Sequence, residues 1–579
     1  MKQLEISDAF EQIADLLELK GENPFRIRAY RRAALNLRGS TEDLEALAQD
    51  DSLEKIPGIG RDLAAKIKEI LSTGNLRFLQ DLKKEIPGSL AALMTVPGIG
   101  PKTAKLVYDR FKVKSIEDLE SVVRSGKLRT LAGFQEKKEG NILRGIQLLR
   151  SGQERMTLGT ALALSEEILK GLKGFPEIKR ICVAGSLRRR RETVRDIDIL
   201  ITSTNPEKVM ERFLRMKLVA QVQAHGETKS SIRTPQGVQV DLRVVDPDSF
   251  GAALVYFTGS KEHNIRIRSL ANRRGLTINE YGVFREKSGK RIAGREEKDV
   301  YKALDLAWIP PELREDLGEV EAAASNRLPH LVERKDLQGD FHIHSDWSDG
   351  HHPIEEVAQA AARLGYRYML LSDHSRSLRV AGGLSESELL EEMEEVRKLN
   401  RRLSPFRILM GAEVDILPDG RMDYPDRILG RLDLVIAAVH SAFKQPEEIM
   451  TRRMVRALRN PFVTILAHPT GRLLGEREAY SVDLEEIYRV ARETNTALEI
   501  NCYTKRLDLN DLHAKRAREV GVRLVLSTDT HVLDQLNSME LGLGVARRAW
   551  VEPADLLNAM KLKDLMAWVA KKRKGGLKG

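Results

Sequence analysis

The sequence predicts a multidomain chain with three successive fold classes: an all-α N-terminal region, an α+β unit and a C-terminal TIM-like (β/α)7 barrel. Residues 1 to about 150 carry apolar residues at helical spacing, interrupted by glycine and proline. From about Ile178, short β runs alternate with helical stretches. From Asp340, seven apolar strands each precede a loop and a helical segment. A chain of 579 residues is also too long for one hydrophobic core.

The charge balance favours a polyanionic partner, because lysines and arginines gain affinity by releasing the counterions condensed on phosphates. The formal net charge is +10 and the pI is about 9.3. A basic but inert surface is the alternative. The two cysteines, Cys182 and Cys502, lie far apart and form no CxxC pair, so neither a disulfide framework nor a thiolate zinc site is expected. With no signal-peptide pattern and no apolar run of about 20 residues, we expect a cytoplasmic protein with no membrane partner.

Two segments of the N-terminal region repeat one pattern, IPGIGRDLAAKI at residues 56–67 and VPGIGPKTAKLV at residues 96–107. Each reads as a Gly-x-Gly turn followed by a helix, formed by Gly58 and Gly60 in the first copy and by Gly98 and Gly100 in the second. Glycines let the amides of the following helix approach a phosphate oxygen. One such turn could be mere punctuation, but two near-copies predict helix-hairpin-helix units that grip the DNA backbone. A degenerate third copy is suggested at residues 131–143.

Three aspartates of the α+β unit predict a two-metal site. Asp196 and Asp198 occupy alternate positions of one strand, so both point to the same face, and Asp241 lies on a neighbouring strand. Gly185 and Ser186 precede them in VAGSLRRRRETVRDIDIL, as in a nucleotidyltransferase. Two Mg²⁺ or Mn²⁺ ions about 4 Å apart could activate a 3′-hydroxyl and neutralise the leaving pyrophosphate. The alternative is a set of acidic residues on the rim of a sheet.

Histidines and acids gather at the predicted strand ends of the C-terminal region, where the active site of a (β/α) barrel forms. Imidazole and carboxylate ligands suit manganese, zinc or iron, and this many ligands predicts a site of two or three ions rather than histidines buried in a core. The predicted ligands are His342, His344, Asp349, His374, Glu413, His440, His468, Asp529 and His531.

The α+β unit resembles the family X DNA polymerases, through the carboxylate motif and through YFTGSKEHNIRIRSLANRRGLTINEYGVF. The resemblance implies roles for several residues around an incoming deoxynucleoside triphosphate. It places Ser186 and Arg189 at the triphosphate, Tyr256, Phe257 and Gly259 at the sugar, Asn264 at the minor groove of the incoming base and Arg268 at the template base. Arg195 departs from the family pattern, in which glycine precedes the first catalytic aspartate.

The N-terminal region resembles the deoxyribose-phosphate lyase subdomain of the same family, through NPFRIRAYRRAA and IPGIGRDLAAKI. The resemblance places Lys66 at the Schiff-base lysine, Tyr30 at a conserved tyrosine and Arg26 at a cation that binds the 5′-phosphate. Asp62 stands where family lyases carry a second lysine. The attacking amine must be neutral, and the alternative for Lys66 is an ordinary solvated helix lysine.

The C-terminal region resembles the polymerase and histidinol phosphatase (PHP) family, with every ligand position filled. The resemblance implies attack of a metal-bound hydroxide on a phosphoester, and by family a 3′–5′ exonuclease with possible AP-endonuclease or 3′-end-processing activity. His351 and His352 are interpreted as loop residues beside the site.

Together these patterns predict the following domains: 1–87, lyase-like with a helix-hairpin-helix; 88–150, helical and DNA-binding; 151–248, nucleotidyltransferase palm; 249–315, nascent-base-pair-binding; 316–337, a linker; and 338–573, PHP.

The predicted function is gap-filling DNA polymerisation in repair, combined with the PHP exonuclease. The expected partners are gapped or abasic duplex DNA and deoxynucleoside triphosphates, and a monomer is expected. Three alternatives stay open: a polymerase whose PHP domain is only structural, a non-catalytic DNA-repair scaffold, and a small-molecule phosphatase. A scaffold has no need for three closely placed anions that repel one another. A small-molecule phosphatase would leave the DNA-binding helices without a role.

Overall fold

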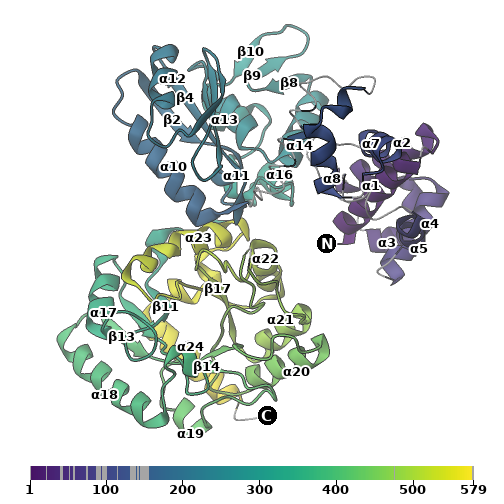
Figure 1. Cartoon of the computed structure of the whole chain (residues 1–579). Helices are drawn as coiled ribbons and strands as arrows, with labels where there is room; N and C mark the ends of the chain where they lie inside the picture. The colour runs from purple at the N-terminus through teal and green to yellow at the C-terminus, as the bar shows by residue number, and fades with distance from the viewer. Residues whose placement is uncertain are drawn as a thin grey trace. The chain divides into compact units, whose positions relative to one another are not determined.

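A computed structural model gives the fold of the chain, which divides into two compact units, Met1–Glu154 and Arg155–Gly579. The residues that the structure describes are 2–20, 22–39, 44–50, 52–56, 59–73, 76–85, 93, 101–113, 115–130, 139, 142–143, 146, 155–474 and 476–576. Figure 1 shows both units, coloured along the chain.

The first unit is helical wherever it is described, as the sequence predicts. One core joins its first five helices, and the rings of Phe10 and Tyr30 meet edge to face there, with centroids 5.6 Å apart. A second core packs around Ala104, Val107 and Leu119. The helices are α1 (Lys2–Lys20), α2 (Pro24–Gly39), α3 (Leu44–Gln49), α4 (Arg61–Thr73), α5 (Arg77–Glu85), α7 (Pro101–Phe111) and α8 (Ile116–Arg124), with 3₁₀ turns η1 (Leu53–Lys55) and η2 (Lys127–Thr130).

The second unit begins with a five-stranded sheet in the order β2-β4-β7-β6-β5. Alternate residues of β4 face opposite sides: Ile199 packs in the core that contains α10 and α12, and Leu200 packs against α13. The sheet therefore lies between two helical layers. The elements are β1 (Met156–Thr157), α10 (Leu158–Leu172), β2 (Ile178–Val183), α11 (Gly185–Arg188), β3 (Thr193–Val194), β4 (Asp196–Ser203), α12 (Pro206–Leu214), β5 (Gln221–His225), β6 (Lys229–Arg233) and β7 (Gln239–Val244).

A small antiparallel sheet, β10-β9-β8, four α-helices and two 3₁₀ turns follow. The segment expected to be a linker at 316–337 is packed instead, because Val320 and Leu331 share a core with Tyr301. Buried Glu319 accepts a 2.6 Å hydrogen bond from His263, which holds this segment to α14. The elements are α13 (Phe250–Thr258), α14 (Lys261–Arg273), β8 (Leu276–Asn279), β9 (Gly282–Arg285), β10 (Arg291–Ala293), α15 (Glu297–Ala303), η3 (Pro311–Leu313), α16 (Glu319–Ala324) and η4 (Arg334–Asp336).

Parallel strands alternate with helices in the C-terminal part, in two sheets, β11-β12-β13 and β14-β15-β16-β17-β18. Isolated bridges His374↔Glu413 and Ile343↔Thr530 connect the two sheets. The strands are β11 (Gly339–Ile343), β12 (Tyr368–Leu371), β13 (Arg407–Met410), β14 (Glu413–Asp415), β15 (Ile436–Ala438), β16 (Ile465–Leu466), β17 (Ala497–Asn501) and β18 (Leu524–Ser527).

The expected closed barrel is not found among the described strands, although the predicted β/α order is. The pairing is interrupted between β13 and β14, where Gly411 lies against the neighbouring strands and an added Cβ would be 3.0 Å from the carbonyl oxygens of Leu371 and Leu434. Figure 1 shows most helices of this part around these strands, with α24 seen across their centre. The helices of this part are α17 (Ile354–Arg363), α18 (Glu386–Arg402), α19 (Asp426–Leu429), α20 (Glu447–Leu458), α21 (Leu484–Glu493), α22 (Asp511–Val520), α23 (Met539–Arg548) and α24 (Leu562–Gly576), with 3₁₀ turns η5 (Arg379–Ala381), η6 (Leu533–Ser538), η7 (Pro553–Asp555) and η8 (Leu557–Ala559).

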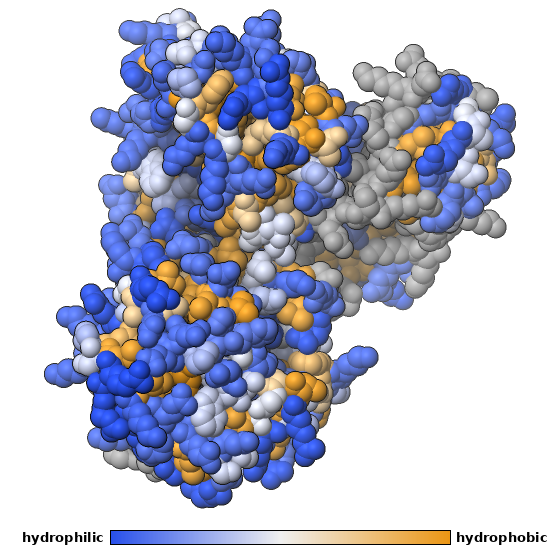
Figure 2. Space-filling view, turned by 60° about the vertical axis from the view of Figure 1, so that its left-hand side comes forward, coloured by the Kyte–Doolittle hydropathy of each residue, from blue (hydrophilic) through white to orange (hydrophobic). Residues whose placement is uncertain are grey.

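The surface is mostly polar. Figure 2 shows hydrophilic side chains over much of the visible face, with scattered apolar residues. Among the described residues, no helix combines the length and the apolar character that crossing a membrane requires.

Candidate active sites

The three aspartates of the palm come together on β4 and β7. These strands are parallel, and their register sets Asp198 directly opposite Asp241. Asp196 and Asp198 alternate with buried Ile197 and Ile199, so both carboxylates leave the same face of β4. Lys229 Nζ and an Arg243 guanidinium nitrogen each lie 3.8 Å from Asp241 Oδ2. The result is a cluster of oxygen donors in which Asp241 forms two long ion pairs.

The electrostatics of this cluster favour a bound cation. Burial, followed by the charges of Asp196 and Asp241, raises the pKa of Asp198 to about 6. A divalent ion would relieve this repulsion, and an all-carboxylate donor set suits hard ions such as Mg²⁺ or Mn²⁺. The residues present therefore fit the expected metal.

Gly185 allows the main chain at the start of α11 to approach Asp198. Its φ is +64°, and an added Cβ would lie 2.6 Å from Asp198 Oδ2. A side chain would therefore meet both backbone strain and a clash. Ser186 follows on α11 and is half-buried.

The residues expected around the sugar and bases lie at the end of α13 and on α14. Tyr256 and Phe257 meet edge to face with centroids 5.0 Å apart. Asn264 donates a 2.7 Å hydrogen bond to the Tyr256 carbonyl oxygen, and the Arg268 guanidinium lies 5.2 Å from the centre of the Tyr256 ring. A small cavity is lined by Tyr256, Asn264 and Arg268 together with residues of β8. Gly259 ends α13 with a φ of +70°.

Arg189 is engaged by protein groups in this structure. Its Nε donates to Glu315 at 2.9 Å, and Nη1 donates to the Thr258 carbonyl oxygen at 2.5 Å. An added Cβ on Gly259 would lie 3.1 Å from Arg189 Nη1. Arg189 thus stands between α11 and the end of α13, and a triphosphate there would have to compete with Glu315 for its guanidinium.

The residues expected at a lyase site gather around Phe78, which the sequence analysis did not identify. Lys66 Nζ and the Arg26 guanidinium each lie 5.3 Å from its ring centre, and Tyr30 stacks on it. Lys66 is held by a 2.5 Å ion pair with Asp62. An ion pair with the acid one turn earlier is the contact that an ordinary helix lysine also makes.

Of the four turn glycines, only Gly60 lies within the described residues; Gly58, Gly98 and Gly100 lie outside them, as does most of the third repeat. Gly60 directly precedes α4, and an added Cβ would meet nothing within 4 Å. No contact with a described residue therefore explains a glycine at this position.

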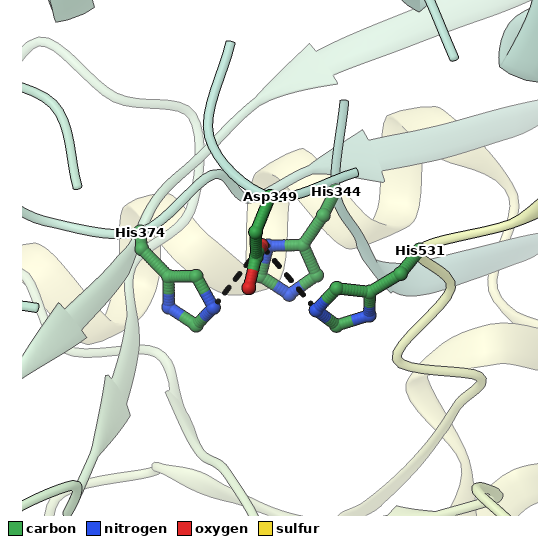
Figure 3. A group of neighbouring side chains, drawn as sticks. All are labelled: His344, Asp349, His374 and His531. Carbon is green, nitrogen blue, oxygen red and sulfur yellow. Dashed lines mark ion pairs between the residues drawn. The ribbon is translucent and has the colours of Figure 1, made fainter. Parts of the chain in front are cut away.

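The predicted ligands of the C-terminal part converge where the strands end. Three groups have ligand atoms within 4.8 Å of one another, and Asp349 joins two histidines through 3.5 and 3.3 Å ion pairs. Figure 3 shows His344, Asp349, His374 and His531 directed toward one another. The groups are His344, Asp349, His374 and His531; His342, His344 and Asp529; and His374, Glu413 and His440.

Glu413 is the centre of this cluster. Its carboxylate lies 2.8 Å from His468 Nε2, 3.0 Å from His374 Nδ1 and 3.2 Å from His440 Nε2. Burial alone would raise the pKa of Glu413, but the neighbouring histidines, His342 first, hold it well below its usual range. Conversely, burial would lower the pKa of His374, but Glu413 and Asp349 raise it to about 10.

Several imidazole nitrogens here are buried without a hydrogen bond of suitable geometry, although carboxylate oxygens lie 3.0 to 3.9 Å from most of them, and this is the strongest sign that these residues fit a metal. Such atoms are costly to bury unless a ligand satisfies them. They are His342 Nε2, His344 Nδ1 and Nε2, His374 Nδ1 and His468 Nδ1.

Carboxylates behind the histidines were missed by the sequence analysis. Glu499 accepts a 2.8 Å hydrogen bond from His342 Nδ1, and Asp415 accepts one of 2.6 Å from His440 Nδ1. Such partners fix which ring nitrogen faces a metal. A signal was present, because Glu499 and Asn501 alternate along an otherwise apolar strand. Arg506, 3.4 Å from Asp529, was also missed, and no motif marks it.

Comparison with known domain families identifies four matching regions along the chain. They are a helix-hairpin-helix domain at 1–76, a SAM-like helix-hairpin-helix tandem at 90–147, a DNA polymerase beta thumb at 253–315 and a PHP domain at 340–502.

Similar proteins cover the chain in whole or in part. The DNA polymerase/3′-5′ exonuclease PolX of Bacillus subtilis (strain 168) is 40% identical over 571 residues, 98% of this chain and 99% of the relative. DNA polymerase lambda of Rattus norvegicus is 28% identical and covers 54% of this chain and 56% of its own. A probable phosphatase of Thermoanaerobacter sp. (strain X514) is 30% identical over 41% of this chain and 96% of its own.

The carboxylate cluster on a polymerase-type sheet and the histidine cluster of a PHP domain define a class of polymerase that carries a second phosphoesterase site. The full-length similarity narrows this class. The chain belongs to the family X DNA polymerases of the bacterial PolX type, as the motifs predicted.

Proposed function

We propose that the protein is a DNA-directed DNA polymerase that fills short gaps during repair and trims 3′ ends with its PHP domain. The observation that supports it most directly is the register that sets Asp198 opposite Asp241, with Asp196 on the same face. When bound, a pair of divalent ions lowers the charge repulsion at the reacting phosphate. Asp196, Asp198 and Asp241 would hold these ions and orient the 3′-hydroxyl for in-line attack on the α-phosphate.

The nucleotide site is proposed around the palm and α13. Ser186 and Arg189 would bind the triphosphate, and an arginine fork suits phosphate oxygens because it donates two parallel hydrogen bonds. Tyr256, Phe257 and Gly259 would shape the sugar pocket. Asn264 and Arg268, which already contact Tyr256, would read the minor groove and support the template base.

The PHP site is proposed to degrade DNA from the 3′ end, with AP-endonuclease or blocked-end removal as further reactions of the same centre. The nine ligands suit two or three ions of manganese, zinc or iron. The buried nitrogens without a hydrogen bond of suitable geometry argue against a purely structural domain, because such a domain would gain stability by replacing them with apolar groups. We propose that the two bridged sheets, with β13 and β14 counted as one interrupted strand, work as a distorted seven-stranded barrel around this site.

The rest of the chain would present the substrate. We propose lyase-like and DNA-binding helical subdomains at 1–87 and 88–150, a palm at 151–248, a nascent-base-pair subdomain at 249–315 and a PHP domain at 338–573. A monomer acting on gapped or abasic duplexes in the cytoplasm is part of this proposal. Gly58, Gly60, Gly98 and Gly100 would lie at the DNA backbone, with Arg26 and Tyr30 near a 5′-phosphate.

The polymerase half is tested by incorporation of one deoxynucleotide into a one-nucleotide gap, using the unaltered protein and Asp196→Asn. We expect incorporation by the unaltered protein only, because the amide cannot carry the charge that holds the ions. An unaltered protein that binds the duplex but adds no nucleotide would favour the scaffold alternative.

A further inference from the structure

An alternating row of buried charges links the PHP domain to the nucleotide site. Arg548, the last residue of α23, pairs with Asp511 at 2.6 Å and with Glu315 at 2.8 Å. The same Glu315 oxygen, Oε1, accepts the hydrogen bond of Arg189 at 2.9 Å. The charges therefore follow the order Asp511, Arg548, Glu315, Arg189. Arg548 pairs with an acid on each side, and Glu315 pairs with an arginine on each side.

This row is shielded from water. The Arg548 side chain exposes 3% of its surface, and those of Arg189 and Glu315 expose 13% and 14%. Burying one of these charges without its partners would be strongly unfavourable, so each depends on its neighbours. A change at Arg548 is therefore felt at Glu315.

The backbone of the same segment is also fixed by α23. Arg548 donates a 2.9 Å hydrogen bond to the Arg189 carbonyl oxygen. Four residues earlier, Gly544 lies against Arg190, and an added Cβ would be 3.0 Å from the Arg190 Cβ. Helix α23 thus contacts the segment that follows α11 in two ways, through the buried charges and through its main chain.

We propose that Arg548 is a positioning residue of the polymerase site: it holds Glu315 so that Arg189 is released to the triphosphate of the incoming nucleotide. This inference rests on the proposed role of Arg189. When a triphosphate takes the Arg189 guanidinium, Glu315 keeps a cation because Arg548 remains paired with it. Without Arg548, Glu315 would keep the ion pair with Arg189 and the weaker attraction of the Arg191 charge, would hold Arg189 more tightly, and nucleotide binding would weaken.

The test is the KM for the deoxynucleotide on a one-nucleotide-gapped duplex with Mg²⁺. We expect Arg548→Ala to raise KM about five- to tenfold with kcat within about twofold, a size typical of coupling between sites. Glu315→Gln is expected to have the opposite sign and lower KM, because the neutral amide no longer competes for Arg189. A merely structural role for this row would not give opposite shifts in KM.

Arg547→Ala is the matched control. Arg547 lies on the same helix and forms a 2.8 Å ion pair with Glu312, three residues before Glu315. That pair does not involve Arg189. We expect its KM to be unchanged. If Arg548→Ala does not fold, Arg548→Lys, which keeps a charge beside Asp511 but lacks the fork, is expected to raise KM by a smaller factor.

Two outcomes would overturn the inference. If Arg189→Ala raises KM while neither Arg548 variant does, the PHP arginine has no part in nucleotide binding. If Glu315→Gln raises KM as Arg548→Ala does, the row is structural. An unaltered protein that incorporates no nucleotide would instead contradict the proposed function, and this inference with it.

Discussion

The two candidate metal sites each contain three predicted acidic ligands, but their surroundings differ. In the palm, Asp196 and Asp198 are half-buried on β4 and Asp241 is buried on β7. Most PHP ligands are enclosed, with His342, His344 and Glu413 at most 1% exposed, whereas the side chains of Asp349 and His531 are 33% and 29% exposed. The exposure of the ligands indicates how each site would keep its ions. An open set of carboxylates suits ions that arrive and leave with a nucleotide, whereas enclosed imidazoles suit ions that stay.

The largest effect expected is on the open site. We predict that Asp198→Asn lowers nucleotide incorporation by about a thousandfold or more, because it removes a ligand that faces both Asp241 and the proposed ions. Primer extension on a gapped duplex measures this. The exonuclease rate of the same protein should stay within a factor of about two, and a parallel loss there would break the separation of the two sites.

The second-largest effect is expected at the PHP site. Glu413→Gln is predicted to lower exonuclease activity by about a hundredfold or more, because Glu413 contacts five histidines and the amide cannot balance their charge with the metals. Release of labelled nucleotides from a 3′ end, together with bound metal measured by elemental analysis, tests it. Normal metal content with normal degradation would contradict the assignment of this cluster.

Carboxylates behind the histidines should have a smaller effect. We predict that Glu499→Gln weakens metal retention about 10- to 100-fold, since it fixes His342 through Nδ1. Competition with a chelator during dialysis measures retention. Glu485→Gln, which removes an exposed acid paired with Arg516, is the control and should change nothing.

The smallest effect is on stability and depends on pH. The folded-state pKa of Asp198, about 6, lies above its ordinary value of 3.8, so ionisation of this group destabilises the metal-free fold. The contribution of this group to stability is therefore largest below about pH 4 and is lost as pH rises through about 6. In chelator at pH 8, Asp198→Asn is predicted to raise the free energy of unfolding by about 1 to 3 kcal/mol, with no gain at pH 4. Calorimetry at both pH values would show it; an equal gain at pH 4 would contradict this origin.

Much of the fold and of both sites could be predicted from the sequence. Alternation along DIDIL set Asp196 and Asp198 on one face, and the regular order of strands and helices placed His344, His440 and Asp529 at strand ends. These features are local, because spacing along one strand decides them.

Features that depend on contacts between distant segments could not be predicted. The ion pair of Arg189 with Glu315 joins residues 126 positions apart, and Glu315 lies just before a segment that looked like a polar linker. Phe78 reaches Lys66 and Arg26 only because the helices of the first unit pack together. The interruption at Gly411 likewise depends on neighbouring strands that no local pattern describes.

The most direct test of two independent sites in one chain uses a labelled primer on a one-nucleotide-gapped duplex with Mn²⁺. The unaltered protein is compared with Asp241→Ala and His344→Ala, each with and without deoxynucleotides. We predict that the primer lengthens only when Asp241 is present and shortens only when His344 is present. A primer that lengthens but never shortens with the unaltered protein would contradict the account, because the PHP domain would then be structural or act on another phosphoester.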